Sequence, residues 1–123
     1  MALTATDWAA LADHCRALPG TTEDRKWDDH PVFSVGGKMY VILSHEPEQA
    51  DRVSLAADPE RFLELTDVPG ITPAPYLARY QWVAVAADAA IGLAALRDLA
   101  DAAHARVLAK LPAAKRRAIT GDA

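Results

Sequence analysis

The sequence predicts an α+β fold, a two-layer sandwich in which an antiparallel sheet of about five strands carries the N-terminal and C-terminal helices on one face. One observation is the pair Gly36-Gly37 between two apolar runs in residues 31–41, because this pair supplies the positive φ angles of a two-residue hairpin turn. The others are helical periodicity at both ends of the chain, in residues 5–18 and 92–110, and short apolar runs between them.

Residues 5–18 open the predicted order of elements with a helix. Trp8, Leu11, Cys15 and Leu18 follow a spacing of three to four residues, and Pro19-Gly20 ends the helix. Residues 21–27 are rich in charge and predict an edge strand with both faces partly exposed to solvent, followed by a turn at residues 28–30.

The strand after the hairpin, residues 38–44, has one wholly apolar side, and we expect this side to contact the helices. It consists of Met39, Val41 and Leu43, which leaves Lys38, Tyr40, Ile42 and Ser44 on the other side. Residues 45–51 predict a polar loop, and residues 52–56 predict a short returning strand.

The second half continues with a short helix, a strand and a long helix. Asp58-Pro59 is typical of an N-cap and first helical residue, and this helix should bury Phe62 with Leu63 or Leu65 before Pro69-Gly70 ends it. We expect an irregular loop at residues 71–79, a strand at 80–86 and a helix at 92–110. One domain then spans residues 1–112, and residues 113–123 form a short basic tail that is frayed or makes one extra turn.

Composition favours one ordinary soluble domain. Half of the 123 residues are apolar, no stretch of 18 uncharged apolar residues occurs, and the N-terminus does not resemble a signal peptide. Cys15 is the single cysteine and cannot form an internal disulfide, so we expect a cytoplasmic protein that does not span a membrane.

Charge is unevenly distributed along the chain. The net charge is −4. Residues 1–50 carry eight acidic and four basic side chains, residues 51–100 carry seven and four, and residues 101–123 carry two and five. The overall field should repel nucleic acid, so any contact with phosphate must be local, and Lys115-Arg116-Arg117 provide either such a contact or a solvated tail.

Several segments in order resemble the MmcQ/YjbR family over residues 8–111. They are the hairpin at 32–41, Leu18-Pro19-Gly20-Thr21-Thr22-Glu23-Asp24, Ser54-Leu55 leading to Asp58-Pro59, Pro69-Gly70-Ile71-Thr72-Pro73, and Trp82. The resemblance implies a fold similar to the bacterial frataxin homologue CyaY. It also implies DNA binding, with hairpins acting as wings.

We expect a binding surface on the sheet face away from the helices. Aromatic and basic side chains there would stack on bases and contact phosphates. The aromatic candidates are Tyr40, Tyr80 and Trp82, and the basic candidates are Arg25, Lys38, Arg52 and Arg79. Alternatively, the aromatics cover a second small core under residues 71–79 or form a dimer contact, and Lys38 is a solvated charge that protects a sheet edge.

Catalysis, cofactors and metals find little support in the sequence. Four histidines lack ligand spacing, and the acidic residues Glu23, Asp24, Asp28 and Asp29 are typical of a solvated turn. Cys15 lies on the apolar stripe of the first helix, and no nucleophile motif or cofactor fingerprint occurs. The sequence therefore predicts a noncatalytic protein without cofactor that binds DNA or, alternatively, a protein partner or small ligand.

Overall fold

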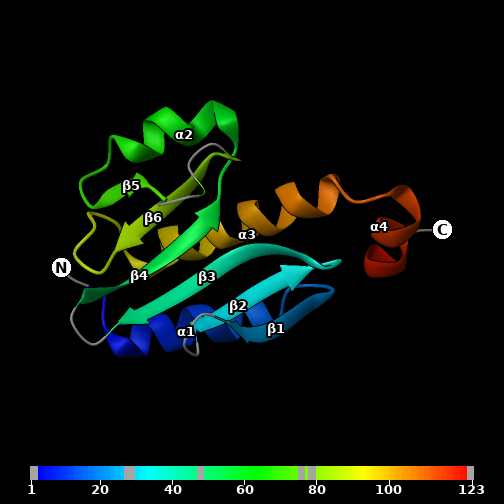
Figure 1. Cartoon of the computed structure of the whole chain (residues 1–123), viewed down its shortest axis with the longest axis horizontal. Helices are drawn as coiled ribbons and strands as arrows, with labels where there is room; N and C mark the ends of the chain where they lie inside the picture. Colours follow the sequence, from blue (N-terminus) through cyan, green and yellow to red (C-terminus); the bar gives the residue numbers. More distant parts are fainter. Residues whose placement is uncertain (1–2, 27–29, 47–48, 75–76, 78–79, 122–123) are drawn as a thin grey trace.

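The computed structural model of the chain describes residues 3–26, 30–46, 49–74, 77 and 80–121, with the backbone alone at 45–46 and 49–51 (Figure 1). Within these residues, six strands form one antiparallel sheet in the order β1-β2-β3-β4-β6-β5. The strands are β1 (Thr21–Lys26), β2 (His30–Val35), β3 (Lys38–Glu46), β4 (Gln49–Ala56), β5 (Ile71–Pro73) and β6 (Trp82–Ala86). The helices are α1 (Ala5–Arg16), α2 (Pro59–Thr66), α3 (Leu93–Ala109) and α4 (Ala113–Thr120).

The predicted α+β fold is confirmed. Helices α1 and α3 lie side by side on one face of the sheet, and Figure 1 shows both behind the strands. The additional strand β5 lies where the sequence predicted a loop, because Ile71 is buried and pairs with Val85 of β6. Strands β3 and β4 also extend into residues 45–51, which were predicted as a loop. Trp27 and residues 28–29 of the predicted turn lie outside the described residues, whereas His30, the third residue of that predicted turn, is the first residue of β2.

One hydrophobic core fills the space between the two helices and the sheet. Leu11 and Cys15 of α1 and Leu96 of α3 are fully buried in the same cluster as Val41 and Leu55 of the central strands. The polar start of α1 is closed by a capping box, in which Thr4 and Asp7 each bond the other's backbone N–H. On the surface of the helices, His14 Nε2 of α1 lies 2.6 Å from Asp101 Oδ1 of α3, and this contact joins the two helices.

A β-bulge in β3 changes which side chains face the helices. Ser34 of β2 pairs with Met39, whereas the preceding Phe33 pairs with Val41, so Tyr40 is the extra residue. Both Tyr40 and Val41 are fully buried, and Tyr40 contacts Cys15 of α1. The predictions that Tyr40 lies on the outer face and that Met39 lies on the helix face are therefore wrong, because the bulge shifts the alternation by one residue.

The face away from α1 and α3 is not an open aromatic platform. By the register, its central positions are occupied by small or aliphatic side chains, and these are at most 7% exposed. They are Val32, Ile42, Ser54 and Ala84. The binding surface that the sequence predicted for this face is therefore not exposed at these positions.

Helix α2 begins as predicted and buries one of the two leucines named. The Asp58 side chain accepts a hydrogen bond from the Glu60 backbone N–H, and Pro59 occupies the first helical position. Leu65 is buried, Phe62 is partly buried, and Leu63 is 80% exposed.

Helix α4 packs against the hairpin end of the sheet, although the sequence predicted a frayed tail or one extra turn. Its Ile119 packs on the core beside Gly20, and Leu111, just before α4, lies against Gly36 of the hairpin turn. Both glycines have positive φ and no side chain, so these apolar residues approach the backbone closely. The C-terminal basic residues are therefore held beside the hairpin.

Candidate functional site

Five basic side chains gather at the end of the molecule formed by the hairpin turn, the C-terminus of α3 and α4. We call this group the basic end; it consists of Lys38, Lys110, Lys115, Arg116 and Arg117. The lysines and Arg117 are exposed, and Arg116 is partly buried. Residues 102–121 include no aspartate or glutamate, so the four C-terminal bases of this group have no acidic neighbours within that segment.

Local chain geometry positions the basic end. Pro112 has no N–H to continue α3, so the chain turns there, and α4 begins at the next residue. Arg116 Nη1 donates hydrogen bonds to the carbonyl oxygens of Ala109 and Leu111, at 3.3 and 3.4 Å, and so closes the C-terminus of α3. Arg116 is thus a positioning residue that holds α4 against α3.

Lys115 connects α4 to the hairpin. Its Nζ donates to the carbonyl oxygen of Gly36 at 3.4 Å, and Gly36 lies two residues before Lys38. Leu111 packs on the same glycine. Lys38 and the C-terminal bases, which are more than 70 residues apart in sequence, are consequently neighbours in space.

The basic residues predicted from sequence do not form one cluster. Lys38 belongs to the basic end, whereas Arg79 lies outside the described residues. Arg52 is in β4, opposite Ser44 and Ala86, and lies on the outer sheet face. Arg25 is exposed in β1, and its alternation with Glu23 places it on the helix face, so the expectation that it joins Arg52 is wrong.

The predicted aromatic face is also not assembled. Tyr40 is fully buried and Trp82 is 7% exposed, so neither presents a ring face for a base to stack on. Of the three, Tyr80 alone is exposed, at 55%. The three aromatics therefore do not form a common stacking surface.

Tyr40 instead belongs to a buried polar network between the sheet and the helices. Its hydroxyl donates to the carbonyl oxygen of Cys15 at 3.2 Å and lies 2.8 Å from Thr21 Oγ1. Its ring packs edge-on against His104, whose Nε2 is 2.7 Å from the carbonyl oxygen of Pro19. Burial raises the pKa of the Tyr40 hydroxyl, so it acts as a neutral hydrogen-bonding group of the core.

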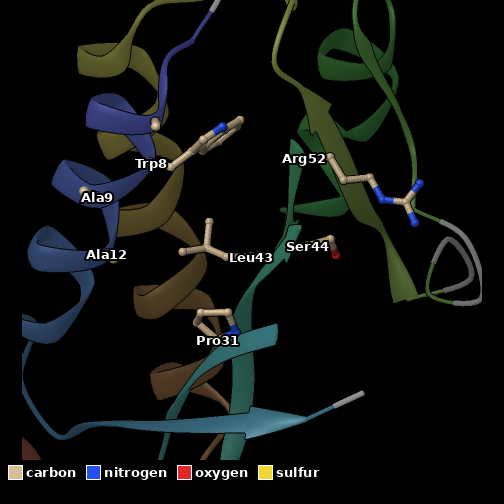
Figure 2. A pocket seen from close by; sticks show the side chains of 8 residues that line it. Trp8, Ala9, Ala12, Pro31, Leu43, Ser44 and Arg52 are labelled. Atoms are coloured by element: carbon tan, nitrogen blue, oxygen red, sulfur yellow. The ribbon is translucent and has the colours of Figure 1, made fainter. Parts of the chain in front are cut away.

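An apolar groove of about 350 Å³ lies between α1 and the ends of β2 and β3. Trp8, Pro31 and Leu43 contribute its larger side chains, beside alanines of α1. Figure 2 shows Leu43 directed towards α1, whereas the Ser44 and Arg52 side chains, which also belong to the lining residues, point away from it. The groove thus offers apolar contact area, and none of the described residues that line it directs a charged group into it.

Within the described residues, no three His, Cys, Asp or Glu side chains are arranged so that they could hold a metal ion. No helix in the described part is both long and apolar enough to cross a membrane.

The fold and the basic end define a small α+β protein with an antiparallel sheet and a charged C-terminal corner. The chain belongs to the YjbR family, since the model of that family matches residues 16–106. The basic end lies largely beyond the matched segment, because only Lys38 falls within it.

Solved structures have a similar fold. A crystal structure of a Deinococcus radiodurans protein with the family-model domain DUF419 has a TM-score of 0.77 and 29% identity, and the alignment covers 92% of this chain and 87% of that one. A Pseudomonas syringae protein of 21% identity has a TM-score of 0.68, with 80% of this chain and 97% of that chain covered, and shows similarity of fold. No curated protein matches the chain.

Proposed function

We propose that this protein is a noncatalytic DNA-binding protein that contacts backbone phosphates through its basic end. The observation that carries the proposal is the contact between Lys115 and Gly36, which brings α4 and the hairpin together. It groups five cations on one corner of a chain whose net charge is −4. Lysine and arginine that neutralise phosphates supply most of the affinity of sequence-independent DNA binding.

The location differs from the one that the sequence favoured. The hairpin is retained, because Lys38 is exposed beside its turn, but the outer sheet face is not, because Tyr40 and Trp82 are buried. Phosphate contacts without aromatic stacking position a protein on DNA and do not read its sequence. The proposed binding is therefore tolerant of sequence.

A protein-interaction or small-ligand module is the alternative. The apolar groove beside Trp8 and Leu43 favours this alternative, because apolar concave surfaces are typical of small-molecule sites. The two functions differ in their response to salt. Phosphate contacts weaken steeply as salt rises, whereas binding in an apolar groove does not.

Charge reversal at the basic end tests the proposal. The double substitution Lys115→Glu and Arg117→Glu should weaken binding to a labelled DNA duplex by on the order of tenfold or more at low salt, measured by fluorescence anisotropy. Arg116 is left unchanged because it closes α3. Circular dichroism should show that the variant remains folded.

The matched control carries the same charge change elsewhere. Lys26→Glu with Arg61→Glu alters exposed side chains of β1 and α2, outside the basic end. We expect this control to retain most of the affinity of the unaltered protein. Equal loss in both double variants would show a response to net charge alone and would refute the proposed site.

A further inference from the structure

Strand β1 is a sheet edge that is open to pairing. Among the described strands, β5 forms the opposite edge, and it has three residues, one of them Pro73. Short length and proline both block the addition of another strand. Strand β1 has six residues and no proline, and residues 22–26 are exposed.

The backbone groups of β1 that face outward can be identified. The Thr21 N–H donates to the carbonyl oxygen of Leu18, outside the sheet, and the Arg25 N–H donates to Asp24 Oδ1 at 2.8 Å. In an antiparallel pair, alternate residues direct both backbone groups to the same side. Glu23 therefore lies, with Arg25, among the residues whose N–H and C=O face away from β2.

The order of charges in β1 is self-complementary in an antiparallel arrangement. Two acidic residues, Glu23 and Asp24, precede two basic residues, Arg25 and Lys26. We propose that β1 pairs antiparallel with β1 of a second copy of this chain, with Glu23 opposite Arg25 of the partner subunit. The two-fold axis then passes between the two Asp24 residues, and both sheets join into one.

This register follows from the alternation and the charges. A two-fold axis perpendicular to the joined sheet keeps each face, so paired residues must come from the same face, as Glu23 and Arg25 do. It makes two reciprocal pairs of opposite charge between directly opposite side chains. The axis could also lie one residue earlier or later along β1 and still pair residues whose backbone groups face outward. Glu23 would then lie opposite Glu23 of the partner subunit, or Arg25 opposite Arg25 of the partner subunit.

We expect the proposed dimer to be weak. The two Asp24 carboxylates lie opposite each other at the axis, and only the diagonal Lys26 of the partner subunit offsets them. Pairing also replaces the bond from the Arg25 N–H to Asp24. A contact limited to one short strand belongs to the small, transient interfaces, so dimerisation should depend on concentration and weaken with salt.

Sedimentation equilibrium with charge-swapped variants tests this pairing. Glu23→Arg and Arg25→Glu should each abolish the dimer, because each places like charges opposite each other twice. An equimolar mixture of the two variants should restore dimerisation, because both cross-strand pairs then have opposite charges. Arg61→Glu, on α2, is the control and should dimerise like the unaltered protein.

Thermal unfolding of each variant identifies misfolding, and Arg25→Glu keeps the monomer's ion pair between Arg16 and Glu23. A protein that stays monomeric over the whole concentration range would overturn the proposal. A dimer that persists in both single variants, or a mixture that stays monomeric although each variant is folded, would also overturn it. The proposal does not depend on DNA binding at the basic end.

Discussion

Cys15 illustrates how the core controls the chemistry of a single residue. Its side chain is fully buried on α1, and burial raises the pKa of the thiol to about 12. The Tyr40 hydroxyl, which lowers this pKa, and the Asp101 charge, which raises it, have smaller effects than burial. Because the thiolate is the reactive form, the residue should behave as an apolar core side chain.

We predict that iodoacetamide does not alkylate Cys15 in the native protein at mildly alkaline pH. Mass spectrometry should show one added group per chain only after denaturant is supplied, because unfolding exposes the thiol and returns its pKa to the ordinary range. The alkylation rate in the absence of denaturant should follow the opening of α1. Rapid labelling of the native state would contradict the buried position of Cys15.

Residue-level prediction from sequence succeeded where alternation is regular and failed at the bulge. Val41 and Leu43 were predicted to face the helices; Val41 is fully buried in the core, and Leu43 packs against it. Tyr40 was assigned to the wrong face because one extra residue in β3 reverses the alternation before it. Nothing in the local pattern of Lys38-Met39-Tyr40 distinguishes a regular strand from a bulged one.

At the scale of elements, the hairpin and α4 support each other. The Gly36-Gly37 turn was predicted from sequence and is confirmed, with φ angles of +58° and +83°. The packing of Leu111 on Gly36 and of Ile119 on Gly20 was not predictable, because it depends on contacts between residues far apart in the chain. The alanine-rich segment after Pro112 offered a local signal of helix, but not of where the helix would pack.

The two turn glycines allow this packing to be measured. Alanine at Gly37 would meet no atom within 4 Å, so only its positive φ is unfavourable, which costs about 1–2 kcal/mol. Alanine at Gly36 has the same backbone problem, and its Cβ would also meet Leu111 Cδ1. We predict a further loss of about 1–3 kcal/mol for Gly36→Ala relative to Gly37→Ala.

Urea unfolding of both variants provides the comparison. If α4 and the corner at Leu111 pack on the hairpin as described, the midpoint for Gly36→Ala lies clearly below that for Gly37→Ala. Identical midpoints would mean that Leu111 moves aside freely. The hairpin would then not hold the basic end in place.

At the scale of the whole molecule, charge is segregated by position. Residues 102–121 contain five basic and no acidic side chains, whereas the rest of the chain carries more acidic than basic side chains. The sequence indicated this asymmetry and the family, and both assignments stand. It did not indicate that Lys38 would join the C-terminal bases, since that depends on the contact of Lys115 with Gly36.

The proposed DNA contact is tested most directly by the salt dependence of duplex binding. Four exposed cations of the basic end that each neutralise one phosphate would give a slope of about −3 to −4 in a plot of the logarithm of the association constant against that of the salt concentration. For the Lys115→Glu and Arg117→Glu variant, we expect a slope that is less negative by about 2. Absence of binding at low salt, or binding that does not change with salt, would contradict a phosphate-binding function.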